Sequence, residues 1–362
     1  MKVCHVTSVH DTFDDRIFSK ECLSLTDEYD VYLIASNAIS QQNGSVHIVG
    51  VPMPEKRLKR VLYLHRIFDA MLVVDADIYH FHDPELMRLG IKIKRHGKKI
   101  IFDSHEDVPM QILQKVWIPT FLRKLLSKVY ACIERGSLSK YDALISVTPT
   151  IVERLKEFNA NTYQITNYPY FEERSDNRQW GHSICFAGGI SPRYLQEVVL
   201  KSIEDTNIEY RLAGPFEEGY EEVLKSQKGW KNVSYYGKIP HDEVYGFIQK
   251  SSVGIAILDY IPNVGYKRGS LGVIKFFEYL SAGIPVVATN FDVWKEIIDK
   301  YQCGIYVNPH DTKAILEAIE FLLSHPEESK AMGDRGLEAV RSEYNWNSQA
   351  VILHHIYHII LQ

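Results

Sequence analysis

The 362-residue chain contains few cysteines and no cysteine motif. There are five, an odd number, scattered along the sequence without a C-x-x-C pair, which argues against a disulfide scaffold. We therefore expect reduced cysteines that pack in the interior of a cytosolic protein.

The sequence also lacks a targeting or membrane-spanning segment of the usual kind. Its first residues, Met1–Val6, predict a strand and not a signal peptide. No uncharged apolar run approaches the roughly 18–20 residues that span a bilayer. We expect a cytoplasmic protein, attached at most peripherally to the inner face of the cytoplasmic membrane.

A positive charge excess is missing as well. The chain has 41 Lys and Arg against 46 Asp and Glu, a net charge of -5, which excludes a bulk electrostatic partner of nucleic acid. Basic side chains do cluster locally, at residues 56–60, 92–99 and 123–128. The third cluster alternates with apolar residues, a pattern typical of an anionic membrane surface or of an ordinary helix whose apolar side faces the core.

Two nucleotide-binding motifs are absent. The first predicted strand ends in Thr7–Asp11 without a glycine, so the G-x-G-x-x-G of dinucleotide-binding domains is missing, and there is no Walker A motif. Hydride transfer and nucleoside triphosphate hydrolysis are therefore excluded.

Two patterns resemble metal ligands only in part. Asp75-Ala76-Asp77 precedes a strand instead of following one, and His354 and His358 have zinc-like spacing without an intervening glutamate. We predict no metal site and no cofactor.

Short apolar runs alternate with helical patterns along nearly the whole chain, which predicts an α/β protein with parallel sheets. The expected strands are Val3–Ser8, Val31–Ala35, Val46–Val51, Ile78–Phe81, Lys99–Phe102, Ala143–Val147, Ser183–Ala187, Glu209–Ala213, Val233–Tyr236, Val253–Ile257, Pro285–Thr289 and Gly304–Val307. These strands form two doubly wound domains.

The domain boundary is expected near Ile165–Arg174, which contains Pro169 and precedes a polar stretch. We predict an N-terminal domain at residues 1–168, a C-terminal domain at residues 169–346 and a final apolar helix at residues 347–362.

One segment carries several features of a phosphate site. Gly272–Asn290 predicts a helix, a glycine stop and a buried strand. Ser270 and Gly272 stand where we expect the helix to begin, and amides at a helix N-terminus favour phosphate. Lys275 in the first turn adds a cation, and Glu278 one turn later offers a carboxylate to a ribose diol.

This segment closely resembles the donor-binding helix of the retaining glycosyltransferases of family 4. The resemblance extends over nearly the whole chain, with matching motifs at Val9–Asp11, Asp15–Lys20, Tyr79–Glu85, Asp103–Glu106, Asn167–Pro169, Gly188–Ile190 and Tyr344–Trp346. It implies the GT-B fold: two Rossmann-like domains facing across a cleft, with the last helix crossing back to the first domain.

The resemblance also implies a reaction. A sugar is transferred from a nucleotide-sugar, expected to be UDP-linked, without a metal and with retention, to a lipid-linked saccharide or polysaccharide precursor of a bacterial surface polysaccharide such as capsule or lipopolysaccharide. Two alternatives stay open: a nucleotide-sugar epimerase on the same scaffold, and a non-catalytic sugar-nucleotide-binding subunit of an assembly complex. Ser270 stands where many members have the first of two glutamates.

The expected site residues fall into three groups. The catalytic candidates are His105, Arg193 and Lys275. The donor-binding candidates are Gly188, Gly189, Gly214, Ser270, Leu271, Gly272 and Glu278. The acceptor-binding candidates are His10, Asp11, His82 and Asp83.

Overall fold

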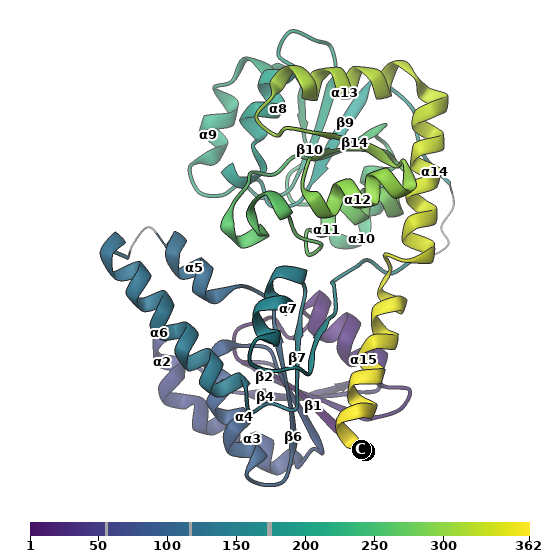
Figure 1. Cartoon of the computed structure of the whole chain (residues 1–362). Helices are drawn as coiled ribbons and strands as arrows, with labels where there is room; N and C mark the ends of the chain where they lie inside the picture. The colour runs from purple at the N-terminus through teal and green to yellow at the C-terminus, as the bar shows by residue number, and fades with distance from the viewer. Residues whose placement is uncertain (55–56, 116–117, 172–175) are drawn as a thin grey trace. The chain divides into compact units, whose positions relative to one another are not determined.

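The computed structural model describes residues 1–54, 57–115, 118–171 and 176–362 (Figure 1). Lys56 of the first basic cluster and residues 172–174 of the predicted linker lie outside this description. The chain divides into two compact units, Met1–Asn167 together with Asn347–Gln362, and Tyr168–Trp346.

The first unit contains a sheet in the order β3-β4-β2-β1-β5-β6-β7-β8, parallel except for β3. Its strands are β1 (Lys2–Thr7), β2 (Asp30–Ser36), β3 (Gln41–Asn43), β4 (Val46–Val51), β5 (Ile78–Phe81), β6 (Lys99–Ser104), β7 (Ala143–Ser146) and β8 (Thr162–Gln164). Every residue of β5 and β7 is buried. Continuous apolar runs follow from burial on both faces of a parallel sheet.

The helices of the first unit connect these strands. They are the π-helical η1 (Asp15–Cys22), α1 (Leu23–Leu25), α2 (Arg57–Arg60), η2 (Val61–Tyr63), α3 (Leu64–Val74), η3 (Pro84–Leu86), α4 (Met87–Lys94), α5 (Val108–Gln114), α6 (Thr120–Leu138) and α7 (Pro149–Lys156). The last helix, α15 (Trp346–Leu361), packs onto this unit, because the hydroxyl of Tyr357 lies 2.8 Å from Nδ1 of His80 in β5.

The second unit contains a six-stranded parallel sheet in the order β11-β10-β9-β12-β13-β14. Its strands are β9 (Ser183–Ala187), β10 (Glu209–Ala213), β11 (Val233–Tyr235), β12 (Val253–Ala256), β13 (Val286–Thr289) and β14 (Gly304–Val307). Its helices are η4 (Pro192–Tyr194), α8 (Gln196–Ser202), α9 (Tyr220–Lys225), η5 (Lys228–Asn232), α10 (His241–Ile248), η6 (Pro262–Val264), η7 (Tyr266–Arg268), α11 (Ile274–Ser281), α12 (Asp292–Tyr301), α13 (Thr312–Ser324) and α14 (Pro326–Ser342).

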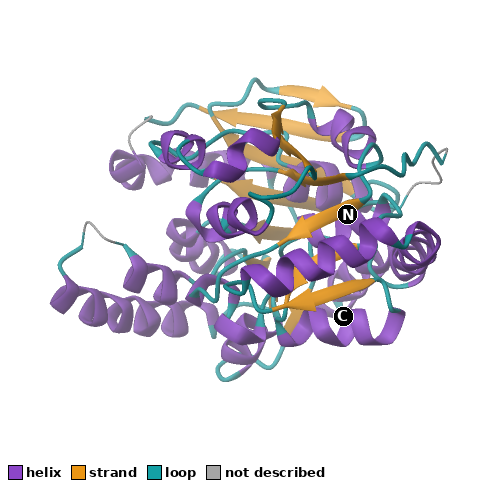
Figure 2. Cartoon of the chain, turned by 90° about the horizontal axis from the view of Figure 1, so that it is seen from above, coloured by secondary structure: helices purple, strands orange, loops and turns teal. Residues whose placement is uncertain are grey.

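Both sheets are doubly wound, which confirms the predicted fold class. The strand order reverses between β1 and β5 in the first unit and between β9 and β12 in the second. Helices are seen on either side of the strands (Figure 2). Ligands of such sheets bind beyond the carboxyl ends of the strands at this reversal, so the loops after these strands are the places to look for function.

Two local features of the helices bear on the site. The segment Asp15–Cys22 is a π-helix, and its N-cap Asp14 accepts hydrogen bonds from the amides of Arg16 and Ile17. Helix α11 starts at Ile274, after Gly269–Gly272 instead of within it. Within the described chain, we find no helix with the length and apolarity that crossing a bilayer requires.

Candidate active site

In the second unit, Lys275 of α11 lies over the loop that follows β9. Its Nζ is 3.3 Å from the hydroxyl of Tyr194 and 4.7 Å from the centre of that ring. A Cβ built on Gly188 would meet Nζ of Lys275 at 2.3 Å. Among the residues that the structure describes, Lys275 has no carboxylate within ion-pair distance, so its charge is available to an anionic ligand.

The glycines at the ends of β9 and β10 pack backbone against backbone. Gly188 and Gly214 both have φ of +133°, a conformation that L side chains rarely adopt. A Cβ on Gly214 would lie 1.9 Å from the carbonyl oxygen of Gly188, whereas one on Gly189 would meet nothing within 4 Å. The exposed Gly189 therefore leaves its backbone open to a ligand.

The segment before α11 is organised differently from the expectation. Oγ of Ser270 accepts a hydrogen bond from the amide of Gly272 at 3.0 Å, and the carbonyl of Ser270 accepts one from Trp294 at 3.2 Å. The Gly272 amide is thus engaged within the turn, and it is not the free helix-terminal donor that the sequence suggested. Ser270 is buried and shapes the turn, while Leu271 beside it is half-buried.

The other two donor-side candidates reach solvent. Arg193 in η4 is exposed and its guanidinium stacks over the ring of Tyr194 at 4.9 Å. Glu278 is half-buried and follows Lys275 by three residues, which places both side chains on one face of α11.

In the first unit, the acceptor-side candidates follow β1 and β5. Asp83 is 2% exposed and accepts hydrogen bonds from Thr7 Oγ1 at 2.8 Å and from the amide of Val9 at 3.2 Å. Nδ1 of His10 lies 3.2 Å from the same carboxylate. Asp11 is exposed and accepts a hydrogen bond from the amide of Phe13. Asp83 thus organises the loop, and its burial disfavours the predicted direct contact with an acceptor.

The charge state of this pair is set by its geometry. Burial opposes the charged form of His10, but the hydrogen bond and the charge of Asp83 outweigh burial and raise the pKa of His10. Burial likewise opposes ionisation of Asp83, yet the His10 contact and the loop hydrogen bonds lower the pKa of Asp83. Both groups are charged together over the weakly acidic range.

His105 follows β6 and is the partly exposed member of a group of imidazoles. Its Nε2 lies 3.3 Å from Oδ2 of Asp103 and 3.3 Å from Nδ1 of His82. The ring of His10 is 4.8 Å from that of His105. His82, also expected to bind the acceptor, has a fully buried side chain whose Nδ1 faces Nε2 of His105.

Sequence reasoning did not select the buried residues behind His82. His5, Arg16, Glu21, His80 and Asp103 are all buried there. A detectable signal existed: His5 and His80 interrupt apolar strands, and the two are register partners on β1 and β5.

The partial metal motifs have other contacts in the structure. Asp75 pairs with Lys98 at 2.6 Å, and Asp77 accepts the amide of Lys2 at 2.9 Å. His354 and His358 both contact Glu28, at 3.2 and 2.7 Å.

Comparison with known proteins assigns the family. Residues 22–166 match the family described as Glycosyltransferase Family 4, and residues 172–339 match Glycosyl transferases group 1. A phosphatidyl-myo-inositol mannosyltransferase of Mycobacterium leprae is 23% identical over 299 residues, 79% of this chain and 74% of that protein.

Two further similarities agree. A GDP-mannose-dependent alpha-(1-6)-phosphatidylinositol monomannoside mannosyltransferase of Mycobacterium tuberculosis is 25% identical over 39% of this chain and 36% of its own length. The structure of sucrose-phosphate synthase from Thermosynechococcus elongatus superposes with a TM-score of 0.75, at 14% identity and with 99% of both chains covered. The two family matches, the doubly wound sheets and these relatives together establish that the chain is a glycosyltransferase of family 4 with the GT-B fold.

Proposed function

We propose that this glycosyltransferase transfers a sugar from a nucleoside diphosphate sugar to a lipid-linked saccharide, with retention and without a metal ion. The main support for the proposal is the position of Lys275. Its side chain lies over the glycine loop after β9 and has no carboxylate partner among the described residues.

The chemistry explains why such a residue is needed. Breaking the sugar–diphosphate bond leaves negative charge on the diphosphate, and an enzyme accelerates this step by binding that charge more tightly in the transition state. We assign the diphosphate to Lys275, the exposed backbone of Gly189 and the guanidinium of Arg193. All three belong to the second unit and lie near the carboxyl end of β9 or at the start of α11.

The remaining donor contacts extend this assignment. Glu278, one turn along α11 from Lys275, is proposed to accept the ribose hydroxyls. Gly188 and Gly214 pack backbone against backbone at the ends of β9 and β10, and we propose that the nucleoside lies beside them. His105 is proposed to orient a hydroxyl of the transferred sugar, with His10 and Asp11 on the acceptor side.

The lipid acceptor is supported by one helix of the first unit. Helix α6 exposes an apolar stripe made of Phe121, Leu125, Leu126, Val129 and Ile133, with Phe121 78% exposed. Basic side chains flank the stripe at Arg123, Lys124, Lys128 and Arg135. Its one acidic residue, Glu134, is buried against Arg154. Exposed apolar residues beside cations fit a surface of anionic lipid, and the Mycobacterium leprae relative is named for a phosphatidylinositol acceptor.

The test is turnover with a panel of donors. The purified protein is incubated with UDP-, GDP- and ADP-sugars and a lipid-linked acceptor extract, and released nucleotide and lipid-linked product are measured with and without EDTA. We expect a UDP-sugar to be used; the tuberculosis relative makes GDP-mannose the competing donor. A new sugar nucleotide formed without acceptor would indicate an epimerase, binding without turnover a non-catalytic subunit, and loss of turnover in EDTA would contradict metal independence.

A further inference from the structure

Behind His105, the first unit contains a continuous hydrogen-bonded chain of imidazoles and one phenol. His105 Nε2 is 3.3 Å from His82 Nδ1, and His82 Nε2 is 3.0 Å from His5 Nδ1. His5 Nε2 is 3.3 Å from the Tyr357 hydroxyl, which is 2.8 Å from His80 Nδ1. The chain therefore runs, in order, through His105, His82, His5, Tyr357 and His80.

Burial confines the four inner members of this chain, His82, His5, Tyr357 and His80, to neutral forms. The side chains of His5, His80 and His82 are 0% exposed. Burial lowers the pKa of His5 to about 3 and, with the charges of neighbouring imidazoles, lowers the pKa of His80 and His82 well below the ordinary value. Burial also raises the pKa of the Tyr357 phenol well above its ordinary value. Each of these four buried members thus carries a single proton on its polar atoms.

Proton counting then leaves two arrangements. With a single proton on His105 as well, the five members carry five protons and form four hydrogen bonds, so one proton is left at one end of the chain. In the first arrangement every donor points inward, His105 carries its proton on Nε2, and His80 keeps an unpaired Nε2–H. In the second every donor points outward and His105 carries its proton on Nδ1. His80 Nε2 has no hydrogen-bond partner among the described residues, so both arrangements leave one inner atom unsatisfied.

The charge of Asp103 favours the first of these two proton arrangements. Burial disfavours its charge, but the adjacent Arg16 guanidinium, 2.7 Å from Oδ2, outweighs burial and holds the pKa of Asp103 well below its usual range. An ionised Oδ2 lies 3.3 Å from His105 Nε2 and 3.8 Å from His82 Nδ1, so the shorter distance favours a proton on His105 Nε2 over one on His82 Nδ1.

The geometry points to a positioning role: we propose that the buried chain His82–His5–Tyr357–His80, together with Asp103, fixes His105 as its Nε2–H tautomer and presents Nδ1 as a hydrogen-bond acceptor. The consequence for transfer rests on the function proposed above. An acceptor nitrogen at the end of β6 receives a hydrogen bond from a sugar hydroxyl, and it cannot donate one to a sugar oxygen.

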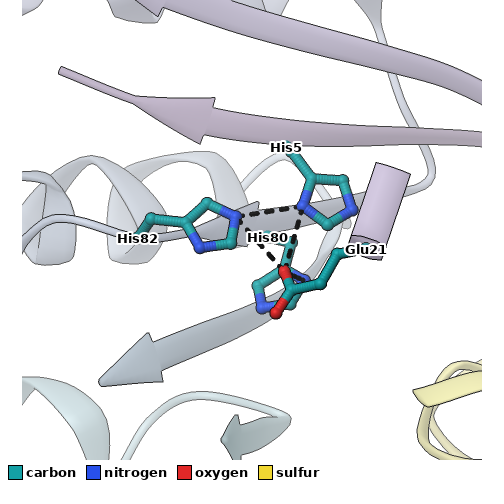
Figure 3. A group of neighbouring side chains, drawn as sticks. All are labelled: His5, Glu21, His80 and His82. Atoms are coloured by element: carbon teal, nitrogen blue, oxygen red, sulfur yellow. Dashed lines mark hydrogen bonds and ion pairs between the residues drawn. The ribbon is translucent and has the colours of Figure 1, made fainter. Parts of the chain in front are cut away.

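A metal ion at the same place is the strongest competing occupant. His5 Nδ1, His82 Nε2 and Glu21 Oε2 form a triangle with sides of 3.0, 3.7 and 3.8 Å (Figure 3). A point equidistant from all three lies about 2.1 Å from each, which matches a zinc–nitrogen bond of roughly 2.0–2.1 Å. Distances alone therefore do not exclude an ion.

The charges of the neighbouring side chains argue against a metal ion. Arg16 Nε contacts Asp103 at 2.7 Å and Glu21 at 3.1 Å. Burial raises the pKa of Glu21 well above its usual value, so a protonated Glu21 leaves Arg16 and Asp103 as a neutral pair. A divalent cation with ionised Glu21 leaves one net positive charge in a buried site beside Arg16, and uncompensated buried charge is strongly unfavourable.

The experiment reads the tautomer directly. Protein labelled with ¹⁵N-histidine is studied by long-range ¹H–¹⁵N correlation spectroscopy, with the His105 signals assigned from His105→Gln. We expect a single Nε2–H tautomer in the wild type and a mixture in Asp103→Asn, which removes the charge that selects the tautomer, and in Tyr357→Phe and His5→Gln, which interrupt the chain. Tyr29→Phe is the matched control, because its ring packs 5.8 Å from that of Tyr357 but its hydroxyl is not in the chain.

Turnover supplies the second readout. Tyr357→Phe should lower kcat by roughly tenfold, in the range that loss of an outer orienting hydrogen bond costs, with KM unchanged and an altered pH profile. Two results would overturn the proposal: His105 keeping one Nε2–H tautomer in all three variants, or one equivalent of metal found in the purified wild type by mass spectrometry. Absence of wild-type turnover would overturn the proposed function instead, leaving the tautomer result intact.

Discussion

The amine of Lys275 and the hydroxyl of Tyr194 lie 3.3 Å apart, above the backbone of Gly188. The face of the tyrosine ring stabilises the positive charge of Lys275. A carboxylate in the same place would neutralise that charge. An amine held in this way loses little entropy when it binds a phosphate, because its position is already fixed.

Lys275→Ala should therefore remove leaving-group stabilisation and leave the fold intact. Loss of one preorganised charged contact costs about 2–4 kcal/mol of barrier, so kcat should fall by roughly 30- to 1000-fold. The measurement is nucleotide release together with a thermal melt. Lys313→Ala, on an 85% exposed side chain of the same unit, is the control and should change neither. If Lys275→Ala lowers the melting temperature substantially along with turnover, the lysine has a structural role.

The glycine loop gives a prediction about stability. Gly214→Ala forces a side chain into φ of +133° and places Cβ 1.9 Å from the Gly188 carbonyl oxygen. Backbone strain of this kind costs about 1–3 kcal/mol, and the clash with backbone adds to it, so we expect at least about 2 kcal/mol of destabilisation in urea unfolding. Gly189→Ala points into open space and should stay within about 0.5 kcal/mol of wild type. Equal stability of the two variants would contradict the close packing.

The sequence predicts the strands well because burial on both faces requires continuous apolar runs, as in β5 and β7. It does not predict β3, whose residues Gln41–Asn43 are all polar and exposed, because this strand is defined by pairing with β4. Short β8, at Thr162–Gln164, was missed for lack of an apolar run.

The candidate site is predictable only where a motif is local. Lys275 and Glu278 are three residues apart on one helix, so their common face follows from helical spacing. The contact between His5 and His82 joins residues 77 positions apart, and it depends on β1 pairing with β5. Arg16 and Glu21 face each other through a π-helical turn, which no periodicity of 3.6 predicts.

His10→Gln should destabilise the protein more at low pH than at high pH. The pKa of His10 is raised in the folded protein, so its charged contact with Asp83 contributes fully below the ordinary histidine value of about 6.5 and is lost as pH rises through the raised value. Asp83, with its pKa lowered, stays ionised down to about pH 4.

We expect a stability difference between wild type and His10→Gln of about 1 kcal/mol larger at pH 5.5 than at pH 8.5, measured by urea unfolding. The exposed His182 provides a control substitution, His182→Gln, that should show no such dependence. A difference that grows as the pH rises would mean that His10 is neutral in the folded protein.

Reversing the charges beside the apolar stripe of α6 should weaken binding to anionic vesicles. Each lysine near such a surface contributes about 1 kcal/mol, so Lys124→Glu with Lys128→Glu should reduce partitioning onto phosphatidylglycerol-containing vesicles by at least roughly tenfold. Phosphatidylcholine vesicles should bind both proteins weakly. Lys250→Glu with Lys313→Glu makes the same change in net charge on the second unit, at exposed positions, and should bind like wild type. If both double variants lose binding equally, net charge and not the α6 surface governs the attraction; if neither does, α6 does not contact lipid.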